Sequence, residues 1–485
     1  MVLTMILNTT RPIDKVHTVE ERTSNNPLRR TFCTHVTIKS SGLRLFLHIK
    51  SMITMIEQLY KAYLASRRVT TDSRAITPGC IFFAFRGETF DGNAFAPQAL
   101  DQGAALCVIS DPQYKVDDRC IVVPDVLATL QQLAAHHRRQ LSIPFIGITG
   151  TNGKTTTKEL VHAVLSRRYR THATVGNYNN HLGVPLTLLA IPADTEIAII
   201  EMGASHPGEI ADLCRIADPD FGLITNVGRA HLEGFGSFEG VVQTKTELYR
   251  HLSAKGGTAF VNADNPTLTA QAAHCGLKIV TYGSGSAQTR GTLVGSNPYL
   301  HFYFEVDDNV YNVRTHLLGN YNFDNCMAAV AAGLFFHVEP WDIKQAIEQY
   351  EPSNRRSQYK QTARNTLFLD CYNANPSSMK VALDNLEALP MPNKVAILGS
   401  MRELGAESAG EHKALADRLN SLPIQAILVG EEFSFVHDNP AYSSLQWFPD
   451  VEAAKASLSQ TPLSGCTILL KGSNSTRMWL LEEVL

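Results

Sequence analysis

The sequence predicts an α/β protein with three domains: a small α/β domain at the N-terminus, a central P-loop domain built on a parallel sheet, and a C-terminal Rossmann-like domain. The length of 485 residues suits about three domains of roughly 100–200 residues each. From Ile143 onward the apolar runs are short and continuous, which is typical of strands buried on both faces of a parallel sheet. After residue 351, four apolar runs end in Gly or Asp and alternate with helical segments, as in a Rossmann-like fold.

Composition and charge narrow the possible functions. A hydrophobic fraction of 44% and a charged fraction of 18% are ordinary for a globular protein. The net charge of -3 and the lack of a long basic block predict no nucleic-acid partner. No apolar run approaches the ~18 residues of a membrane span. Nine scattered cysteines, without a C-x-x-C pair or zinc-type spacing, and the absence of a signal-peptide pattern predict a cytoplasmic protein with reduced thiols.

The chain divides into a leader and three domains. Residues 1–51 are mixed polar sequence with no sustained period, so we expect a disordered leader or a misassigned start, with the working start at Met52 or Met55. The pattern of apolar and polar segments changes after a polar helix that ends near Gln140 and again after residues 351–354. The predicted domains therefore cover residues 52–140, 141–350 and 351–485.

The first domain alternates helical and strand-like segments. The apolar pattern of residues 56–63 predicts a short amphipathic helix. Strand-like pieces follow at 81–85 and 105–109, with turn residues between them. A polar helix at 134–140 closes the domain.

A glycine-rich segment at 150–157, Gly-Thr-Asn-Gly-Lys-Thr-Thr-Thr, has the composition of a phosphate-binding loop. Glycines let backbone N–H groups approach a polyphosphate, Lys154 adds a cation and Thr155 offers a hydroxyl to Mg²⁺. The spacing is a shortened Walker pattern, because Ile148 stands where a further glycine is usual. A glycine-rich turn with a chance lysine is the alternative, but an apolar run before it and a helical pattern after it favour an ATPase-type domain.

Two further residues lie where predicted strands of the central sheet end. Glu201 follows the apolar run 197–200, and ligands gather at the carboxyl edge of such sheets. A carboxylate there can hold Mg²⁺ together with Thr155, although a solvated acid is the alternative. His231 follows the next strand and can bind a second cation or donate to a phosphate, whereas a lone histidine is usually structural. The less regular stretch 256–318 predicts an antiparallel portion.

For several polar residues the sequence pattern allows more than one role. By spacing alone, Lys245 is a surface lysine on a helix. Asn320 and Asn325 open an alanine-rich helix, where their carboxamides can cap the helix or contact an adenine edge.

Other candidates lie in or near the third domain. Arg355 and Arg356 fall at the predicted hinge, where a guanidinium can reach a γ-phosphate when domains close or can simply be linker charge. Asp370 ends a strand and fits either a nucleotide contact or a turn cap. The segment 471–475 is predicted to begin the last helix, whose N-terminus could hold a carboxylate.

These segments together resemble the Mur ligase family, from about Met55 to the C-terminus. The matching segments occur in the order of the family's motifs: 71–74, 90–93, 150–157, 177–185, 201–204, 226–231, Lys245, Asn325, Asp370 with 373–376, and 471–473. So many ordered matches exceed what chance similarity produces.

The resemblance implies an ATP-dependent amide synthesis. The stretches Asn-Ala-Asn-Pro at 373–376 and Lys-Gly-Ser at 471–473, without an Asp-Asn-Pro-Arg signature, resemble the branch that joins D-alanyl-D-alanine (D-Ala-D-Ala) to UDP-N-acetylmuramoyl-tripeptide (UDP-MurNAc-tripeptide). There the first domain would hold the UDP end, the second ATP, and the third would close over both. The tripeptide carboxylate would attack the γ-phosphate, and the dipeptide amine would displace phosphate from the resulting acyl phosphate. The product would be UDP-MurNAc-pentapeptide, a peptidoglycan precursor, and we expect a monomer.

The resemblance also implies roles for individual residues. The ATP-binding residues would be Gly150, Thr151, Asn152, Gly153, Lys154, Thr155, Thr156, Asn325, Arg356 and Asp370. Two Mg²⁺ ions would be held by Thr155, Glu201, His231 and Lys245, the lysine being carbamylated and therefore an anion. The substrate-binding residues would be Asp72, Ser73, Arg74, Asn179, Asn180, Asn373 and Asn375. Catalysis would rest on Lys154, His231 and Lys245.

Two positions depart from the family pattern. Ser400 stands where the family's Gly-Asp-Met-x-Glu-Leu-Gly has an acid, and Trp479 stands where a glutamate usually follows. Both lie in the third domain, so the departures concern the dipeptide site more than the ATP site. A sister amide ligase with another amine acceptor, and a nucleotide-binding protein without catalysis, are the alternatives. The joint presence of Glu201, His231 and Lys245 favours turnover.

Overall fold

The computed structural model describes residues 40–352 and 358–485, and describes side chains from residue 53. The chain separates into the units Met1–Thr54 and Met55–Leu485. Helix α2 (Ser40–Ser66) begins inside the predicted leader, whose residues 1–39 lie outside the described part. The predicted helix at 56–63 is confirmed as part of α2. No helix in the described residues is long and apolar enough to cross a membrane.

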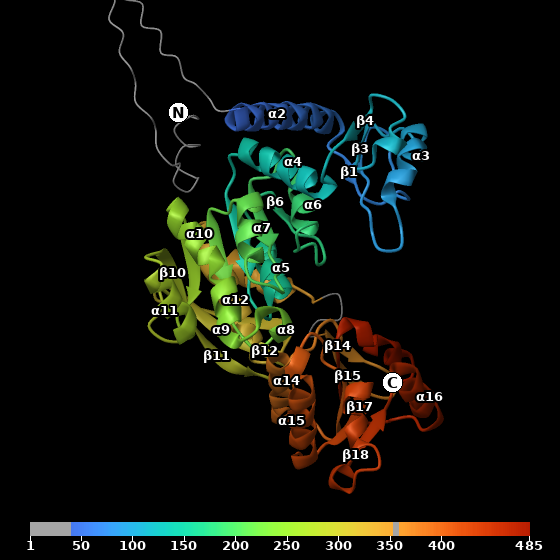
Figure 1. The fold of residues 1–485 in the computed structure, drawn as a ribbon. Coiled ribbons are helices and arrows are strands. Elements are labelled where there is room, and N and C mark those ends of the chain that lie inside the picture. Colours follow the sequence, from blue (N-terminus) through green and yellow to red (C-terminus); the bar gives the residue numbers. More distant parts are fainter. Residues whose placement is uncertain (1–39, 353–357) are drawn as a thin grey trace, which may run out of the picture. The chain divides into compact units, whose positions relative to one another are not determined.

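The N-terminal domain carries a small parallel sheet (Figure 1). Its four strands pair in chain order: β1 (Val69–Thr70), β2 (Ile81–Phe83), β3 (Leu106–Ile109) and β4 (Cys120–Val122). Helices α3 (Ala96–Asp101) and α4 (Val126–Gln140) accompany them. The Asp125 side chain accepts from the Ala128 N–H at 2.9 Å and so caps α4. The predicted strands at 81–85 and 105–109 are confirmed as β2 and β3, and the helix predicted at 134–140 is the end of α4.

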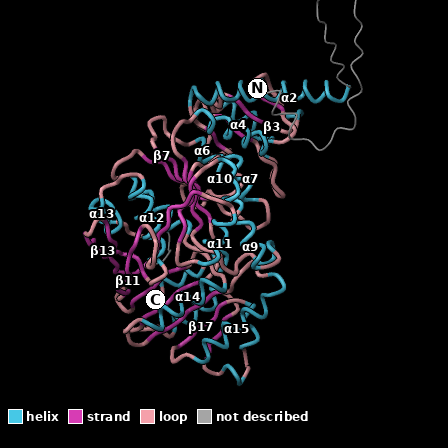
Figure 2. The backbone as a smooth tube through the Cα atoms, turned by 90° about the vertical axis from the view of Figure 1, so that its left-hand side faces the viewer, coloured by secondary structure: helices cyan, strands magenta, loops and turns pink. Residues whose placement is uncertain are grey.

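The central domain is built on a nine-stranded sheet of order β13-β12-β11-β10-β9-β8-β5-β7-β6, whose strands run side by side in Figure 2. The strands are β5 (Phe145–Thr149), β6 (Thr171–Ala173), β7 (Ile197–Glu201), β8 (Phe221–Ile224), β9 (Thr258–Asn262), β10 (Lys278–Gly283), β11 (Thr289–Ser296), β12 (Tyr299–Val306) and β13 (Asn309–Leu318). The helices are α5 (Lys154–Leu165), α6 (Gly183–Leu189), α7 (Glu209–Ala217), α8 (Leu232–Phe235), α9 (Phe238–Lys245), α10 (Glu247–Lys255), α11 (Pro266–His274), α12 (Asn322–Phe335) and α13 (Pro340–Gln349).

The antiparallel portion predicted within 256–318 is confirmed, and it occupies the second part of that stretch. Strands β11, β12 and β13 form antiparallel pairs, as expected for 256–318. Strands β9 and β10 are parallel to their neighbours. Helix α10 connects β8 to β9 and α11 connects β9 to β10, as crossovers between parallel strands. Every residue of β5 and β7 is buried, which agrees with the continuous apolar runs that predicted a parallel sheet.

The C-terminal domain has a six-stranded sheet of order β14-β15-β19-β16-β17-β18, parallel except for β14. The strands are β14 (Gln358–Gln361), β15 (Thr366–Asp370), β16 (Lys394–Gly399), β17 (Gln425–Val429), β18 (Leu445–Phe448) and β19 (Thr467–Lys471). The helices α14 (Pro376–Ala388), α15 (Ser408–Ser421) and α16 (Val451–Gln460) alternate with them. The four strands predicted for a Rossmann-like domain are confirmed as β15, β16, β17 and β19.

The predicted α-helix beginning at 471–475 is wrong. Lys471 ends β19, and two 3₁₀ helices follow at Asn474–Thr476 and Met478–Glu483. Arg477 adopts a left-handed conformation with φ of 49°, which interrupts any regular helix. Met478 and Leu481 are both buried, and their spacing of three residues suits a 3₁₀ turn.

Candidate functional site

The predicted phosphate-binding loop joins β5 to α5. Gly150 has φ of 143° and Gly153 has φ of 79°, conformations that residues with side chains rarely adopt. A Cβ atom on Gly153 would lie 2.6 Å from the Asn325 Oδ1 atom, and one on Gly150 would lie 2.0 Å from the Thr225 Oγ1 atom. Both positions therefore require glycine, for backbone shape and for close packing. The loop leads into the N-terminus of a 12-residue helix, which favours bound anions.

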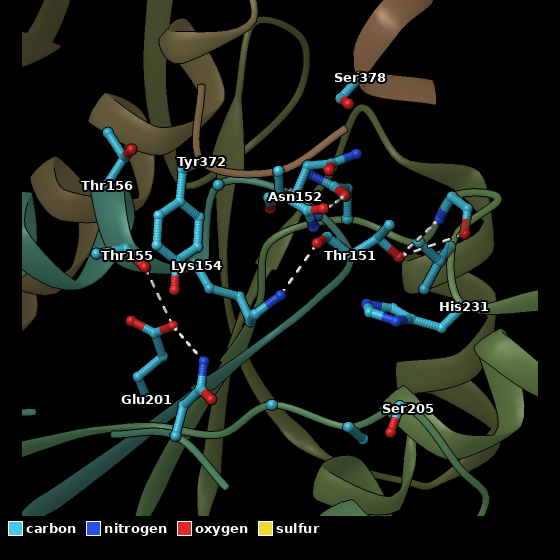
Figure 3. A pocket seen from close by; sticks show the side chains of 18 of the residues that line it. Thr151, Asn152, Lys154, Thr155, Thr156, Glu201, Ser205, His231, Tyr372 and Ser378 are labelled. Atoms are coloured by element: carbon cyan, nitrogen blue, oxygen red, sulfur yellow. Dashed lines mark hydrogen bonds between the residues drawn. The ribbon is translucent and has the colours of Figure 1, made fainter. Parts of the chain in front are cut away.

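Lys154 folds back over its own loop in this structure. Its ammonium group donates to the Gly150 carbonyl at 2.8 Å and to the Thr151 carbonyl at 3.0 Å. The bond to the Thr151 carbonyl is drawn in Figure 3. A phosphate group is a stronger acceptor than a neutral carbonyl because it is charged. The side chain is thus placed to exchange backbone carbonyls for a nucleotide phosphate.

Thr155 and Glu201 meet at the carboxyl edge of the sheet, as predicted from the strand ends. The Thr155 hydroxyl donates to Glu201 Oε1 at 3.1 Å, and the Asn179 amide donates to the same oxygen at 2.8 Å (Figure 3). The other carboxylate oxygen, Oε2, is buried without a hydrogen-bond partner. A buried carboxylate oxygen without a partner is costly. A hard cation would satisfy it, so these side chains fit Mg²⁺.

His231 comes to the cavity from the start of α8. It has φ of 51°, and its Nδ1 atom contacts the carboxylate of Glu403 in the C-terminal domain. This close contact with His231 holds the pKa of Glu403 below its ordinary value. His231 therefore lies between the two domains rather than on the central sheet alone.

Lys245 is buried, so the expectation of a surface lysine was wrong. Its side chain is 2% exposed, its ammonium donates to the Ala204 carbonyl at 3.2 Å, and it lies 5.3 Å from the Phe235 ring centre. Burial, and next the charge of Lys154, hold its pKa well below the ordinary value. The prediction from residue spacing was wrong because tertiary packing buries the C-terminal end of α9. A neutral amine is the form that reacts with carbon dioxide.

Asn325 and Asp370 each have partners within the protein. The Asn325 Oδ1 atom accepts from the Thr157 hydroxyl at 3.0 Å, and its amide donates to Asn322 Oδ1 at 2.8 Å, which ties α12 to α5. Asp370 pairs with the buried ammonium of Lys471 at 2.5 Å. Arg355 and Arg356 lie outside the described residues.

The predicted substrate-binding residues are dispersed. Asn375 caps α14, and its amide donates to Asn152 Oδ1 at 2.9 Å, which links the C-terminal domain to the phosphate loop. Asn180 accepts from the Gly183 N–H at 2.8 Å at the start of α6. Asp72 pairs with Arg74 at 2.8 Å beyond β1, and the hydrogen bonds from Arg74 lower the pKa of Asp72 to about 2. Ser73 lies between them.

A cavity of about 910 Å³ brings many of these residues together. Its lining includes the predicted residues Thr151, Asn152, Gly153, Lys154, Thr155, Thr156, Asn179, Asn180, Glu201, His231, Asn325, Asp370 and Asn373. Gly150, Lys245, Asn375 and the 72–74 turn are not part of this lining. Glu403, which sequence reasoning gave no role, does line it. Its position just beyond the end of β16 was the available signal, because strand ends form the ligand-binding edge.

Together the parallel sheet, the glycine loop and the acid on the neighbouring strand define a P-loop nucleotide-binding protein. Comparison with known protein families is consistent with a nucleotide-binding protein of this class. The description "Mur ligase family, catalytic domain" matches residues 67–138, "Mur ligase middle domain" matches 148–333, and "Mur ligase, glutamate ligase domain" matches 355–474. The chain belongs to the Mur ligase family.

Named relatives match most of the chain. A Bacillus subtilis protein named UDP-N-acetylmuramoyl-tripeptide--D-alanyl-D-alanine ligase is 38% identical over 75% of this chain and 82% of its own. An Escherichia coli protein of the same name is 34% identical over 88% and 94%. The crystal structure of MurF from Acinetobacter baumannii superposes with a TM-score of 0.78 at 33% identity, over 86% of this chain and 92% of its own. MurF from Thermotoga maritima in complex with ADP gives 0.75 at 27%, over 86% and 97%.

Proposed function

We propose that this chain is an ATP-dependent ligase that joins D-Ala-D-Ala to UDP-MurNAc-tripeptide and releases ADP and phosphate. The observation that carries the proposal is the cavity itself. It combines a phosphate loop, an orphaned carboxylate oxygen on Glu201 and side chains from the C-terminal domain in one space. Relatives that bear this activity in their names match the chain over most of its length.

The nucleotide would lie along the loop between α5 and the C-terminal domain. The backbone N–H groups of the loop and the ammonium of Lys154 would bind the β- and γ-phosphates. Bound ADP in the Thermotoga relative supports a nucleotide here. Asn325, and Asp370 with Lys471, also line the cavity, and we place the nucleoside beside them. The loop's fixed donors neutralise charge and align the γ-phosphate with the carboxylate that attacks it.

Two divalent cations are part of the proposal. Magnesium would neutralise phosphate charge and align the γ-phosphate with its acceptor. Thr155 and Glu201 would hold one ion, because they present a hydroxyl and a buried carboxylate oxygen. His231 and a carbamylated Lys245 would hold the second, since carbamylation turns a buried cation into an anionic oxygen ligand. The depressed pKa of Lys245 supports this modification.

The amide forms in two steps. The tripeptide carboxylate attacks the γ-phosphate, which gives an acyl phosphate and ADP. The dipeptide amine then attacks the acyl carbon, so that a C–N bond forms, the C–O bond to phosphate breaks and inorganic phosphate leaves. The nitrogen loses one proton before it attacks and a second as the amide forms.

We further propose that the chain acts as a monomer in the cytoplasm. The cavity is lined by residues from 131 to 471 of a single chain, so a second copy is not needed to complete it. The eight cysteines in the described residues are free thiols, which suits a reducing compartment.

Replacing Glu201 by glutamine tests the first cation site. Glutamine keeps the shape and can still accept from Thr155, but it removes the charge that attracts Mg²⁺. We expect the Mg²⁺ concentration for half-maximal activity to rise at least about tenfold. Glu196→Gln is the matched control, because Glu196 immediately precedes β7, the strand that Glu201 ends, and pairs with Arg170 instead. Equal Mg²⁺ dependence in both variants would remove Glu201 from the cation site.

The function itself is tested with the purified chain, ATP, Mg²⁺ and UDP-MurNAc-tripeptide. ADP release should depend on D-Ala-D-Ala, and the pentapeptide product should appear by mass spectrometry. Stimulation by free amino acids in place of the dipeptide would identify a sister ligase. Nucleotide binding without any product would identify a protein that has lost catalysis.

A further inference from the structure

The loop that follows β16 brings one carboxylate of the C-terminal domain to the cavity. This loop, residues 400–405, is held at several points before it reaches Glu403. The Ser400 hydroxyl donates to Glu432 at 2.6 Å, and the Met401 N–H donates to His412 Nε2 at 3.0 Å. The Ser473 hydroxyl donates to the Ser400 carbonyl at 2.9 Å. The carboxylate of Glu432 thus lies beside Ser400, at the position where the family pattern has an acid. These hydrogen bonds also fix the shape of the loop.

The acids that line the cavity differ in what surrounds them. Two of them, Asp212 and Asp370, pair with the cations of Arg215 and Lys471. Two others accept hydrogen bonds: Glu201 from Thr155 and Asn179, and Glu209 from the N–H groups of Ser205 and His206. Asp324 lies beside Asn262. Glu403 instead faces the ring of His231, and its side chain is 59% exposed. The Asp212 side chain is exposed to the same extent, but it is already paired with the cation of Arg215. Among the lining carboxylates, Glu403 therefore combines high exposure with the lack of a lysine or arginine partner in the described residues.

The position of Glu403 suits one substrate group in particular. D-Ala-D-Ala enters as a dipeptide with a positively charged amino terminus, whereas ATP and the tripeptide substrate are anionic. The amine must approach the acyl phosphate, which forms where Lys154 and His231 line the same cavity. Charged hydrogen bonds between an ammonium and a carboxylate are short and directional, so they can align the nitrogen for attack.

We propose that Glu403 binds the ammonium group of the incoming dipeptide and thereby forms the amine end of the acceptor site. This inference rests on the proposed function, because it concerns the second substrate of that reaction. The C-terminal domain then supplies the group that brings the amine to the acyl phosphate on the central domain. Glu403 acts on the second step and has no part in phosphorylating the tripeptide.

The test uses Glu403→Gln in the full-length chain. We expect the KM for D-Ala-D-Ala to rise about 10- to 100-fold, the size of one lost charge-assisted hydrogen bond. The KM values for ATP and UDP-MurNAc-tripeptide should stay at their wild-type values. Hydroxylamine provides a second readout, because it is largely uncharged at neutral pH and traps the acyl phosphate as a hydroxamate. The yield of tripeptide hydroxamate should equal that of the wild type.

Glu407→Gln is the matched control. Glu407 lies four residues after Glu403 and contacts the central domain through Arg229 at 2.5 Å, but it does not line the cavity. We expect this variant to keep the wild-type KM for the dipeptide. A loss shared by both variants would mean that the glutamates hold the domains together, which would overturn the proposal.

The remaining outcomes distinguish a failure of the Glu403 proposal from a failure of the proposed function. If Glu403→Gln lost hydroxamate formation together with dipeptide transfer, Glu403 would serve the first step with His231, and the proposal would be wrong. An unchanged dipeptide KM would also overturn it. If the wild-type chain formed hydroxamate but no dipeptide product, the proposed function itself would fail.

Discussion

Lys154→Met is expected to reduce kcat by about 10²–10³-fold, the cost of removing one fixed donor from a transition-state anion. The ammonium group belongs to the first residue of α5, and its present partners include the carbonyls of Gly150 and Thr151. A γ-phosphate would replace those carbonyls, and methionine cannot provide the charge. Steady-state rates of ADP release, measured at saturating ATP and Mg²⁺, give this number directly.

The variant should also remain folded. Thermal unfolding of Lys154→Met should stay close to that of the wild type, because the helix and the glycine turn persist. Lys255→Met removes a lysine from α10, far along the sequence from the loop, and should keep wild-type kcat. Wild-type turnover in Lys154→Met would contradict the placement of the γ-phosphate on this loop.

Lys245→Ala is expected to lower activity by about 10³-fold, because several kcal/mol of transition-state stabilisation would be lost with the second cation site. Short carboxylic acids should restore part of the activity by supplying the missing carboxylate in the space left by the side chain. Removing dissolved carbon dioxide should lower wild-type activity, and bicarbonate should return it. Full activity of the alanine variant, or no response to carbon dioxide, would reject carbamylation.

Stability gives an independent test at the same position. The folded-state pKa of Lys245 lies below its ordinary value of 10.5, so the unfolded chain binds a proton that the folded chain does not. This lysine therefore costs stability below pH 10.5, and the cost fades as the pH rises through 10.5. In buffer free of metal, nucleotide and carbon dioxide, Lys245→Met should unfold at a higher temperature than the wild type at neutral pH. The gap should narrow at high pH, and a less stable methionine variant would contradict the argument.

The parts of the site that follow from local sequence could be predicted. The glycines, Lys154 and Thr155 lie within one strand-turn-helix unit, whose geometry depends on neighbouring residues. Glu201 and His231 could be placed because strand ends of a parallel sheet meet at one edge. The same regularity predicted the three α/β domains and the parallel character of the central sheet.

The parts that depend on packing between distant segments could not be predicted. The burial of Lys245 depends on Ala204 and Phe235 and leaves no trace in the spacing of α9. The contact between His231 and Glu403 joins residues far apart in the chain. The last predicted α-helix failed because the left-handed Arg477 interrupts it, and arginine gives no warning of that conformation.

The most direct test of the account follows one oxygen atom. UDP-MurNAc-tripeptide labelled with oxygen-18 in its terminal carboxylate is incubated with the chain, ATP, Mg²⁺ and D-Ala-D-Ala, and the released phosphate is analysed by mass spectrometry. An acyl phosphate on this P-loop transfers one labelled oxygen into each phosphate that accompanies the pentapeptide. Pentapeptide formed together with unlabelled phosphate would contradict the account.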